Sequence, residues 1–317
     1  MSSVAYACPE DDPDPASSPV WFPVLTGDGW IPVAQDAIGS TVFVPLCDSS
    51  RVRNGVISGI TGSGKSVSAK AVLLPGVAAG VETLLLADGQ RGVGCPVLRP
   101  VASRYGRSPQ QWRELIELAY RVLMARMDRR GAAGTTRWNT MGETDPIVTL
   151  ALNEAGAIKP HLTSRHIALV NEIIAQGGPV GVRVVQITWS LGADDVIGGA
   201  GARDLIVGGG WAICHRGSPG AAALARQFGA NIDLRDLAAG QAAVMIGGTP
   251  APSPSQVHHV SDEQITELLP TLVVRHLDGA DAAAAGPGYS AAHWNDWSPR
   301  SNISPVEDDA AGESGDR

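Results

Sequence analysis

The sequence predicts an α/β fold in which a mostly parallel sheet is covered by helices on both faces. Apolar runs recur along the chain with helix-like segments between them, which is typical of strands buried on both sides. The 317 residues are 44% hydrophobic and 18% charged, so a sizeable core can form. The expected strands are VISGI (56–60), VETLLLA (81–87), PIVTLAL (146–152), VRVVQIT (182–188), WAICH (211–215) and QAAVMI (241–246).

Capping and spacing signals predict the helices between these strands. Ser108 is suited to an N-cap and Pro109 to the first helical position, and apolar residues at helical spacing extend this helix to about Arg130. A helix-compatible segment also begins at Val67, and Pro75 is expected to end or kink it early. Further helices are expected over Thr163–Gln176, Pro219–Phe228 and Ser261–Val274.

Composition divides the chain into five parts. Residues 1–19 are acidic and rich in Pro and Ser, and residues 277–317 are rich in Ala, Gly, Ser and acids, so we expect both to be disordered. Residues 20–50 are expected to form a small β-rich segment, residues 51–260 the main domain, and residues 261–276 a C-terminal helix.

The net charge of −8 is distributed unevenly. Residues 1–50 hold seven acids and no Lys or Arg, residues 51–260 hold 21 bases and 14 acids, and residues 261–317 hold three bases and 11 acids. Nine Arg lie within Arg99–Arg137, which could contact nucleic-acid phosphates. A solvated helix face or a subunit interface explains such a segment equally well.

Targeting signals are lacking in the sequence. The N-terminal residues have neither a basic region nor an apolar core, and no apolar run is long enough to cross a bilayer. The four cysteines have no CxxC spacing, which argues against a zinc site or a disulfide framework. We therefore expect a cytoplasmic protein without a membrane segment of its own.

A phosphate-binding loop is the strongest motif. It comprises Gly59, Ile60, Thr61, Gly62, Ser63, Gly64, Lys65 and Ser66, which fit GxxxxGK[ST] between a strand and a helix. Glycines let successive amides point at phosphate oxygens, and the helix N-terminus favours negative charge. Lys65 can reach the terminal phosphates of ATP, and the Ser66 hydroxyl can ligate Mg²⁺. ATP and Mg²⁺ are thus the expected ligands, and a glycine-rich linker with a stray lysine is the alternative.

A second nucleotide element is expected where an apolar strand ends in acid. The run 146–152 is followed by Asn153, at the position that usually carries the Asp supporting Mg²⁺, and then by Glu154. Glu154 is placed to orient or activate the attacking water. A buried strand that ends in a capping Asn is the alternative.

The order of these motifs resembles the FtsK/SpoIIIE family of DNA-translocating ATPases, including TraB-type plasmid transfer proteins. The resemblance covers roughly 51–248. It is carried by ISGITGSGKSV, LLLADGQRG, LMARMDRRGAAGTTRWN, IVTLALNEAG, EIIAQGGPVGVRVVQITWSLGADDVIGG and GANIDLRDLAAGQAAVM. The resemblance implies a RecA-like P-loop NTPase over residues 51–260, a hexameric ring around double-stranded DNA, and a sensor role for Thr188.

The sequence departs from the family pattern where chemistry is expected. Asn153 replaces the Walker B Asp, Trp189 replaces a polar Gln after Thr188, and Gly178 replaces an Arg that could serve as an arginine finger. The other candidates for that role are Arg183, Arg203 and Arg216. These departures predict slow hydrolysis with near-normal ATP binding, and they predict that Asn153→Asp raises turnover.

The sequence therefore predicts an ATP-driven motor on duplex DNA, in conjugative transfer or chromosome segregation. In this interpretation Glu154, Lys65 and Thr188 are catalytic, and Ser66 and Asn153 support the metal. The alternative is a nucleotide-binding regulatory or scaffold subunit with weak or no hydrolysis. A small-molecule kinase with the same loop is a weaker alternative, because its lid-like arginine pattern is missing.

Overall fold

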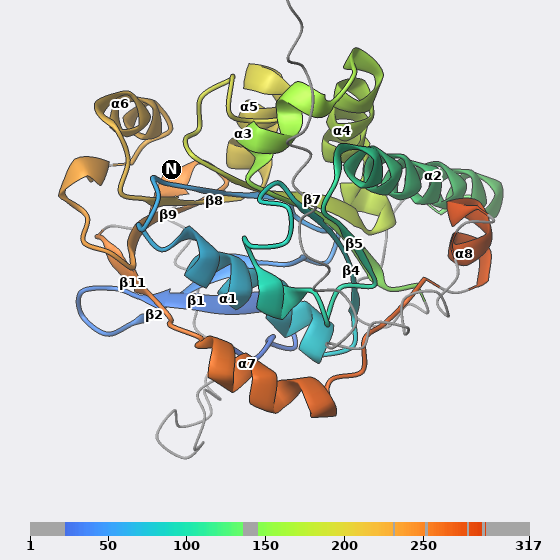
Figure 1. Cartoon of the computed structure of the whole chain (residues 1–317), viewed down its shortest axis with the longest axis horizontal. Coiled ribbons are helices and arrows are strands. Elements are labelled where there is room, and N and C mark those ends of the chain that lie inside the picture. Colours follow the sequence, from blue (N-terminus) through green and yellow to red (C-terminus); the bar gives the residue numbers. More distant parts are fainter. Residues whose placement is uncertain are drawn as a thin grey trace, which may run out of the picture.

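The computed structural model describes residues 23–135, 145–230, 232–250, 253–277, 279–286 and 289. A single sheet runs through the molecule, with strands in the order β2-β1-β11-β9-β8-β3-β7-β6-β4-β5 and with β10 paired to β9 (Figure 1). The strands are β1 (Trp30–Gln35), β2 (Thr41–Pro45), β3 (Gly55–Ser58), β4 (Glu82–Asp88), β5 (Arg104–Gly106), β6 (Ile147–Asn153), β7 (Val182–Thr188), β8 (Trp211–His215), β9 (Gln241–Ile246), β10 (Thr249–Pro250) and β11 (Ser255–Val257).

The strands β8, β3, β7, β6, β4 and β5 pair parallel with one another, whereas β8 pairs antiparallel with β9 and the strands from β9 to β2 pair antiparallel. All six expected strands are confirmed, because each is a buried run of apolar residues. The expected β-rich segment 20–50 contributes β1 and β2, which extend this same sheet through β11. The first 22 residues lie outside the described part.

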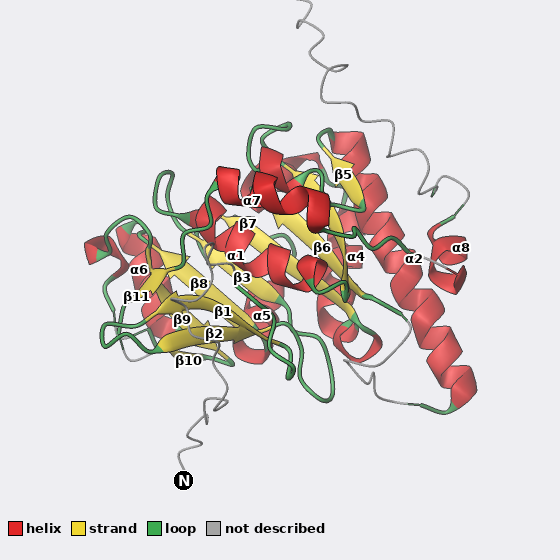
Figure 2. Cartoon of the chain, turned by 90° about the horizontal axis from the view of Figure 1, so that it is seen from below, coloured by secondary structure: helices red, strands yellow, loops and turns green. Residues whose placement is uncertain are grey.

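Helices cover both faces of the sheet, as expected. They are α1 (Lys65–Ala78), α2 (Pro109–Ala133), α3 (Ala155–Ile158), α4 (Ser164–Gln176), α5 (Gly199–Gly209), α6 (Pro219–Gln227), α7 (Asp262–Leu268) and α8 (Gly279–Ala285). One core cluster contains side chains of the helices α2, α3, α4, α5 and α6 and of one face of the strands, and the second contains side chains of α1, α7 and the other face. Figure 2 draws these helices in red and the strands in yellow. Short 3-10 turns occupy Pro96–Leu98, Lys159–His161, Gly178–Val180, Leu234–Asp236 and Leu269–Thr271.

The capping signals locate two helix starts. The Ser108 hydroxyl accepts from the Gln111 amide at the start of α2, and the Ser261 hydroxyl accepts from the Gln264 amide at the start of α7. Pro75, however, lies inside α1, which continues to Ala78, so the expected early end is wrong. A proline this near the C-terminus of a helix removes only one amide donor from the last turns.

The C-terminal part differs most from expectation. The helix expected over 261–276 stops at Leu268, is followed by the 3-10 turn Leu269–Thr271, and then becomes extended. The tail expected to be disordered from 277 forms α8, which packs beside the second half of α2 (Figure 1). That expectation is wrong for 279–285, because Asp281 is buried in an ion pair with Arg126.

Candidate nucleotide site and basic helix

The glycine loop lies at the carboxyl edge of the parallel strands, between β3 and α1. Gly59, Gly62 and Gly64 all have positive φ, at 154°, 75° and 118°. A Cβ on Gly59 would lie 2.5 Å from the Ser63 hydroxyl, and one on Gly64 would lie 3.0 Å from the His215 ring. A side chain would therefore collide at Gly59 and be crowded at Gly64, and the positive φ favours glycine at all three positions.

Both ends of the loop are held by backbone hydrogen bonds. The Gly59 amide donates to the Thr188 carbonyl at 3.2 Å, and the Ile60 amide donates to the Arg216 carbonyl at 2.9 Å. The Gly240 amide donates to the Ser63 carbonyl at 3.0 Å. Between these fixed points, Thr61 and Gly62 are exposed, and so is Ser66 after them. The exposed part of the loop is therefore open to a phosphate chain.

Lys65 is buried at the start of α1. Its ammonium lies 3.4 Å from the Ile60 carbonyl oxygen and 3.8 Å from Glu154 Oε1. Burial lowers the pKa of Lys65, and the nearby Glu154 carboxylate partly offsets this. The ammonium thus lies within reach of both the glycine loop and the Glu154 carboxylate.

Glu154 lies one residue beyond the end of β6. It has a left-handed backbone, with φ at 56°, and its side chain is only 10% exposed. Besides Lys65, its Oε1 accepts a hydrogen bond of 3.3 Å from Gln90 Nε2. Left-handed backbone in a residue other than glycine costs free energy and is enriched at functional sites. The structure thus brings two predicted catalytic residues, Lys65 and Glu154, together.

Asn153 is engaged differently from the metal-supporting role expected for it. It is 3% exposed, and its Nδ2 donates to Asp88 Oδ1 at 3.1 Å, across paired residues of β4 and β6. Its Oδ1 remains as a possible metal ligand, together with the exposed Ser66 hydroxyl. Within the described ranges, no group of three or more His, Cys, Asp or Glu side chains could hold a metal. A Mg²⁺ ion here would therefore need phosphate oxygens and water as its main ligands.

Thr188 supports the loop through its backbone. Its hydroxyl, buried at the end of β7, donates to the Asp195 carbonyl at 2.9 Å, while its own carbonyl accepts from Gly59. Trp189 follows and is 46% exposed. A Cβ on Gly156 would lie 3.2 Å from the Trp189 ring, so the indole lies against the first turn of α3, next to Glu154. The catalytic role of Thr188 stays a prediction.

His215, at the end of β8, is a site residue that the sequence did not reveal. Its Nε2 lies 2.7 Å from the Ser68 hydroxyl of α1, and its Nδ1 lies 2.9 Å from the Gln241 carbonyl. The carbonyl requires a proton on Nδ1, so Nε2 accepts from Ser68. Burial lowers the pKa of His215 to about 4, and the positive charge of Lys65 contributes. A neutral imidazole therefore packs against the glycine loop at Gly64.

One arginine-finger candidate is excluded by burial. The Arg183 side chain is fully buried and donates to Glu82 at 3.0 Å and to the Thr149 hydroxyl at 2.7 Å, within the sheet. Arg203 donates to its neighbour Asp204 at 2.8 Å. Arg216 contacts the glycine loop through its carbonyl oxygen. Arg183 therefore cannot act as an arginine finger.

The basic segment Arg99–Arg137 is partly neutralised inside the molecule. Arg126 is 2% exposed and donates to Asp281, which also accepts from Arg129 at 2.7 Å. Arg121 donates to the Ala285 carbonyl at 2.7 Å. Residues 136–144, with Arg137, lie outside the described part. The interpretation of this segment as a phosphate-binding surface therefore does not apply to Arg126.

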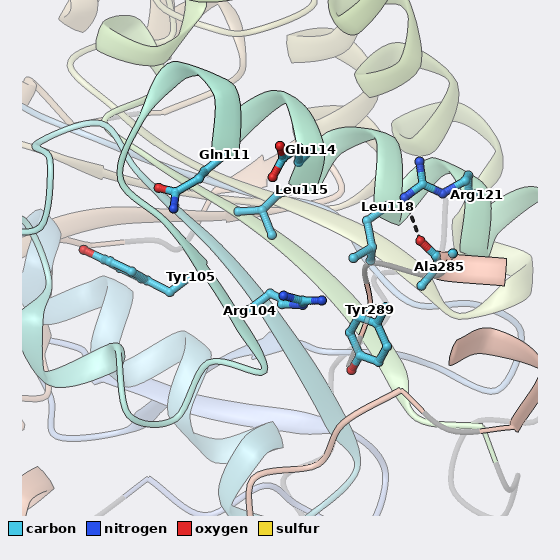
Figure 3. A pocket seen from close by; sticks show the side chains of 10 residues that line it. Arg104, Tyr105, Gln111, Glu114, Leu115, Leu118, Arg121, Ala285 and Tyr289 are labelled. Atoms are coloured by element: carbon cyan, nitrogen blue, oxygen red, sulfur yellow. Dashed lines mark hydrogen bonds between the residues drawn. The ribbon is translucent and has the colours of Figure 1, made fainter. Parts of the chain in front are cut away.

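A cavity of about 430 Å³ lies between α2, β5 and the C-terminal segment (Figure 3). Its lining combines apolar, aromatic and charged side chains: Arg104, Tyr105, Gln111, Glu114, Leu115, Leu118, Arg121, Ala285, Gly286 and Tyr289. The Tyr105 hydroxyl donates to Asp88 Oδ2 at 2.9 Å. The cavity is thus connected through one side chain to the residues beside Glu154.

No helix in the described ranges is both long and apolar enough to cross a membrane. No protein-family model matches the chain, and no curated protein matches it.

Solved structures do match the fold. The chain is similar to the pCW3 conjugation coupling protein TcpA in its monomer form with ATPγS, with a TM-score of 0.62 and 14% identity over 79% of this chain and 74% of that one. It is similar to EssC ATPases 2 and 3 from Geobacillus thermodenitrificans, with a TM-score of 0.60 and 14% identity over 78% and 49% of the chains. It is also similar to Thermomonospora curvata EccC ATPases 2 and 3 in complex with a signal sequence peptide, with a TM-score of 0.57 and 15% identity over 82% and 53%.

The chain thus spans about half the length of the EssC and EccC chains. Similarity at such low identity shows the fold alone, and it confirms the expected α/β, RecA-like architecture with a mostly parallel sheet.

Proposed function

We propose that this chain is an ATP-binding motor domain of the FtsK/SpoIIIE kind that acts on double-stranded DNA, in conjugative transfer or chromosome segregation. Lys65 carries the nucleotide part of the proposal. Its buried ammonium lies at the start of α1, between an open glycine loop and the Glu154 carboxylate 3.8 Å away. A terminal phosphate needs a cation and free amides, and an attacking water needs a carboxylate nearby.

Each residue then has a defined task. The loop amides and Lys65 bind the phosphates, which removes Lys65 from its ion pair with Glu154. The freed Glu154 carboxylate accepts a hydrogen bond from the attacking water and orients it. Bound Mg²⁺ would add positive charge beside the phosphates, held by Ser66 directly and by Asn153 through water.

The DNA, subunit and compartment parts of the proposal come from the sequence resemblance. Duplex DNA would meet the arginines of α2 that stay accessible, among them Arg113, rather than the buried Arg126. A homo-oligomer, as a hexameric ring, would supply the missing arginine finger from a neighbour. Such a ring would work in the cytoplasm. TcpA, a conjugation coupling protein of the same fold, favours transfer over the other processes.

A regulatory or scaffold subunit that binds ATP with weak or no hydrolysis is the second candidate. The specific observation in its favour is Asn153, whose amide contacts Asp88 where motors of this kind carry a carboxylate toward the metal. Without that charge, transition-state stabilisation by the metal falls, while the loop amides, Lys65 and Ser66 still bind nucleotide.

Three proteins decide between these functions: the natural chain, Lys65→Ala and Glu154→Gln. Calorimetry measures ATP binding, and phosphate release is followed with and without duplex DNA. A motor binds ATP, hydrolyses it faster on DNA and loses turnover in Glu154→Gln. A regulatory subunit binds ATP with no DNA-stimulated turnover. Unchanged ATP affinity in Lys65→Ala would rule out both.

A further inference from the structure

We propose that the turn 88–94 is a positioning element for the Glu154 carboxylate, with Gln90 as the residue that touches it. The inference rests on the proposed ATPase function. Gln90 Nε2 donates to Glu154 Oε1 at 3.3 Å, from beyond the end of the neighbouring strand β4. Once phosphates draw Lys65 away, Gln90 is the remaining side-chain donor to Glu154 in the described part of the chain. It then limits the directions in which the carboxylate can face.

Asp88 fixes the shape of this turn. Its buried carboxylate accepts five hydrogen bonds, from the amides of Gln90, Gly92 and Gly94, from the Tyr105 hydroxyl and from Asn153 Nδ2. The turn also packs on the end of β6: a Cβ on Gly89 would lie 2.9 Å from the carbonyl oxygens of Asn153 and Glu154. The turn cannot shift without disturbing these contacts, so Gln90 is held in place.

The same contacts explain why position 153 carries an amide and not a carboxylate. Asp88 and Asn153 are paired residues of β4 and β6, and Asn153 presents a donor to Asp88 Oδ1 at 3.1 Å. Two carboxylates at that distance would repel each other, and neither would offer the donor that Asn153 Nδ2 supplies. Asn153→Asp would therefore disturb the turn and would not raise turnover, contrary to the expectation from sequence alone.

A double-mutant cycle on unfolding tests the pair without any need for hydrolysis. The midpoint of urea unfolding is measured at pH 7.5 for the natural chain, Asn153→Asp, Asp88→Asn and the double variant. We expect each single variant to unfold at lower urea, and the double variant to recover part of the loss, because it again pairs one carboxylate with one amide. Strictly additive losses would overturn the pairing, as would an Asn153→Asp variant as stable as the natural chain.

Turnover of Gln90→Met tests the positioning role. Gln90 is exposed, and Met has a similar length but no donor. We expect kcat to fall about tenfold, with KM for ATP and the unfolding midpoint unchanged, because the chemical step alone needs the orientation. Gln110→Met is the matched control, since Gln110 is an exposed glutamine of α2 that contacts Glu114.

Equal rates in Gln90→Met and Gln110→Met, or a change confined to KM, would overturn the inference. If Glu154→Gln is inactive while Gln90→Met is not impaired, only the role of Gln90 fails. If the natural chain hydrolyses no ATP, the proposed motor function fails and the role of Gln90 with it.

Discussion

Asp281 of α8 provides a quantitative test of how the C-terminal segment is held. Its carboxylate is fully buried and accepts from Arg126 Nε at 2.9 Å and from Arg129 Nη2 at 2.7 Å. Asp281→Ala leaves the Arg126 charge buried. The guanidinium keeps only its backbone acceptors, the carbonyls of Pro146, Val180 and Gly181.

Breaking a buried ion pair by removing one partner typically costs about 3–5 kcal/mol. The three carbonyls that remain on Arg126 place the expected loss at the lower end, at about 3 kcal/mol. With an m-value of about 3 kcal/mol/M, the midpoint of urea unfolding should fall by about 1 M. Circular dichroism across a urea series measures it.

Two variants serve as controls. Arg129→Ala removes the partner that is 35% exposed, and it should cost no more than about 1 kcal/mol. The double variant Arg126→Met with Asp281→Leu should recover at least half of the loss, because an apolar pair needs no desolvated charge. A loss in Asp281→Ala no larger than that in Arg129→Ala would refute the reasoning.

Three further predictions concern the nucleotide site and DNA. Lys65→Ala should lower ATP affinity at least tenfold in calorimetry. In the described part of the chain, Lys65 is the only buried cation beside the glycine loop, and the substitution removes it. Between pH 7.5 and 5, His215 should reduce the unfolding free energy by about 2 kcal/mol, because its folded pKa of about 4 lies below the unfolded value of 6.5, so the unfolded chain takes up the proton first. His215→Asn should remove that share of the pH dependence in urea midpoints, and an unchanged pH dependence would contradict it. DNA affinity, if present, should fall steeply from 50 to 200 mM salt in fluorescence anisotropy with no sequence preference, and a flat response would contradict phosphate contacts.

The strands and the glycine loop could be predicted because their signals are local. A parallel strand covered on both faces must be apolar along its whole length, so β4, β6 and β7 stand out in the sequence. The glycine loop fixes its own geometry through residues only five positions apart. Helix starts with a side-chain cap, such as the one at Ser108, are local in the same sense.

The missed features depend on partners distant in sequence. α8 contains mostly alanine and glycine, and it is ordered because Asp281 meets Arg126, which lies 155 positions earlier. His215 becomes a site residue only when β8 is placed beside β3, with α1 above them. Sequence alone marks Asn153 as a departure from the motif, whereas the β4–β6 register places it opposite Asp88. The spacing of residues within one segment does not reveal which distant residues they will contact.

Partners distant in sequence also decide which arginines can contribute to a basic surface. A count of arginines suggests a strongly basic surface over Arg99–Arg137, but Arg126 is buried and shares the Asp281 carboxylate with Arg129, which also contacts Asp145. Each arginine neutralised inside the protein releases no counterion from DNA, so it adds nothing to the salt dependence of binding, whose slope is about −0.9 for each phosphate neutralised. The nine arginines of the segment therefore set an upper bound on its phosphate contacts. Removing α8 should raise that slope, because Arg126 and Arg129 would then be free to meet phosphates.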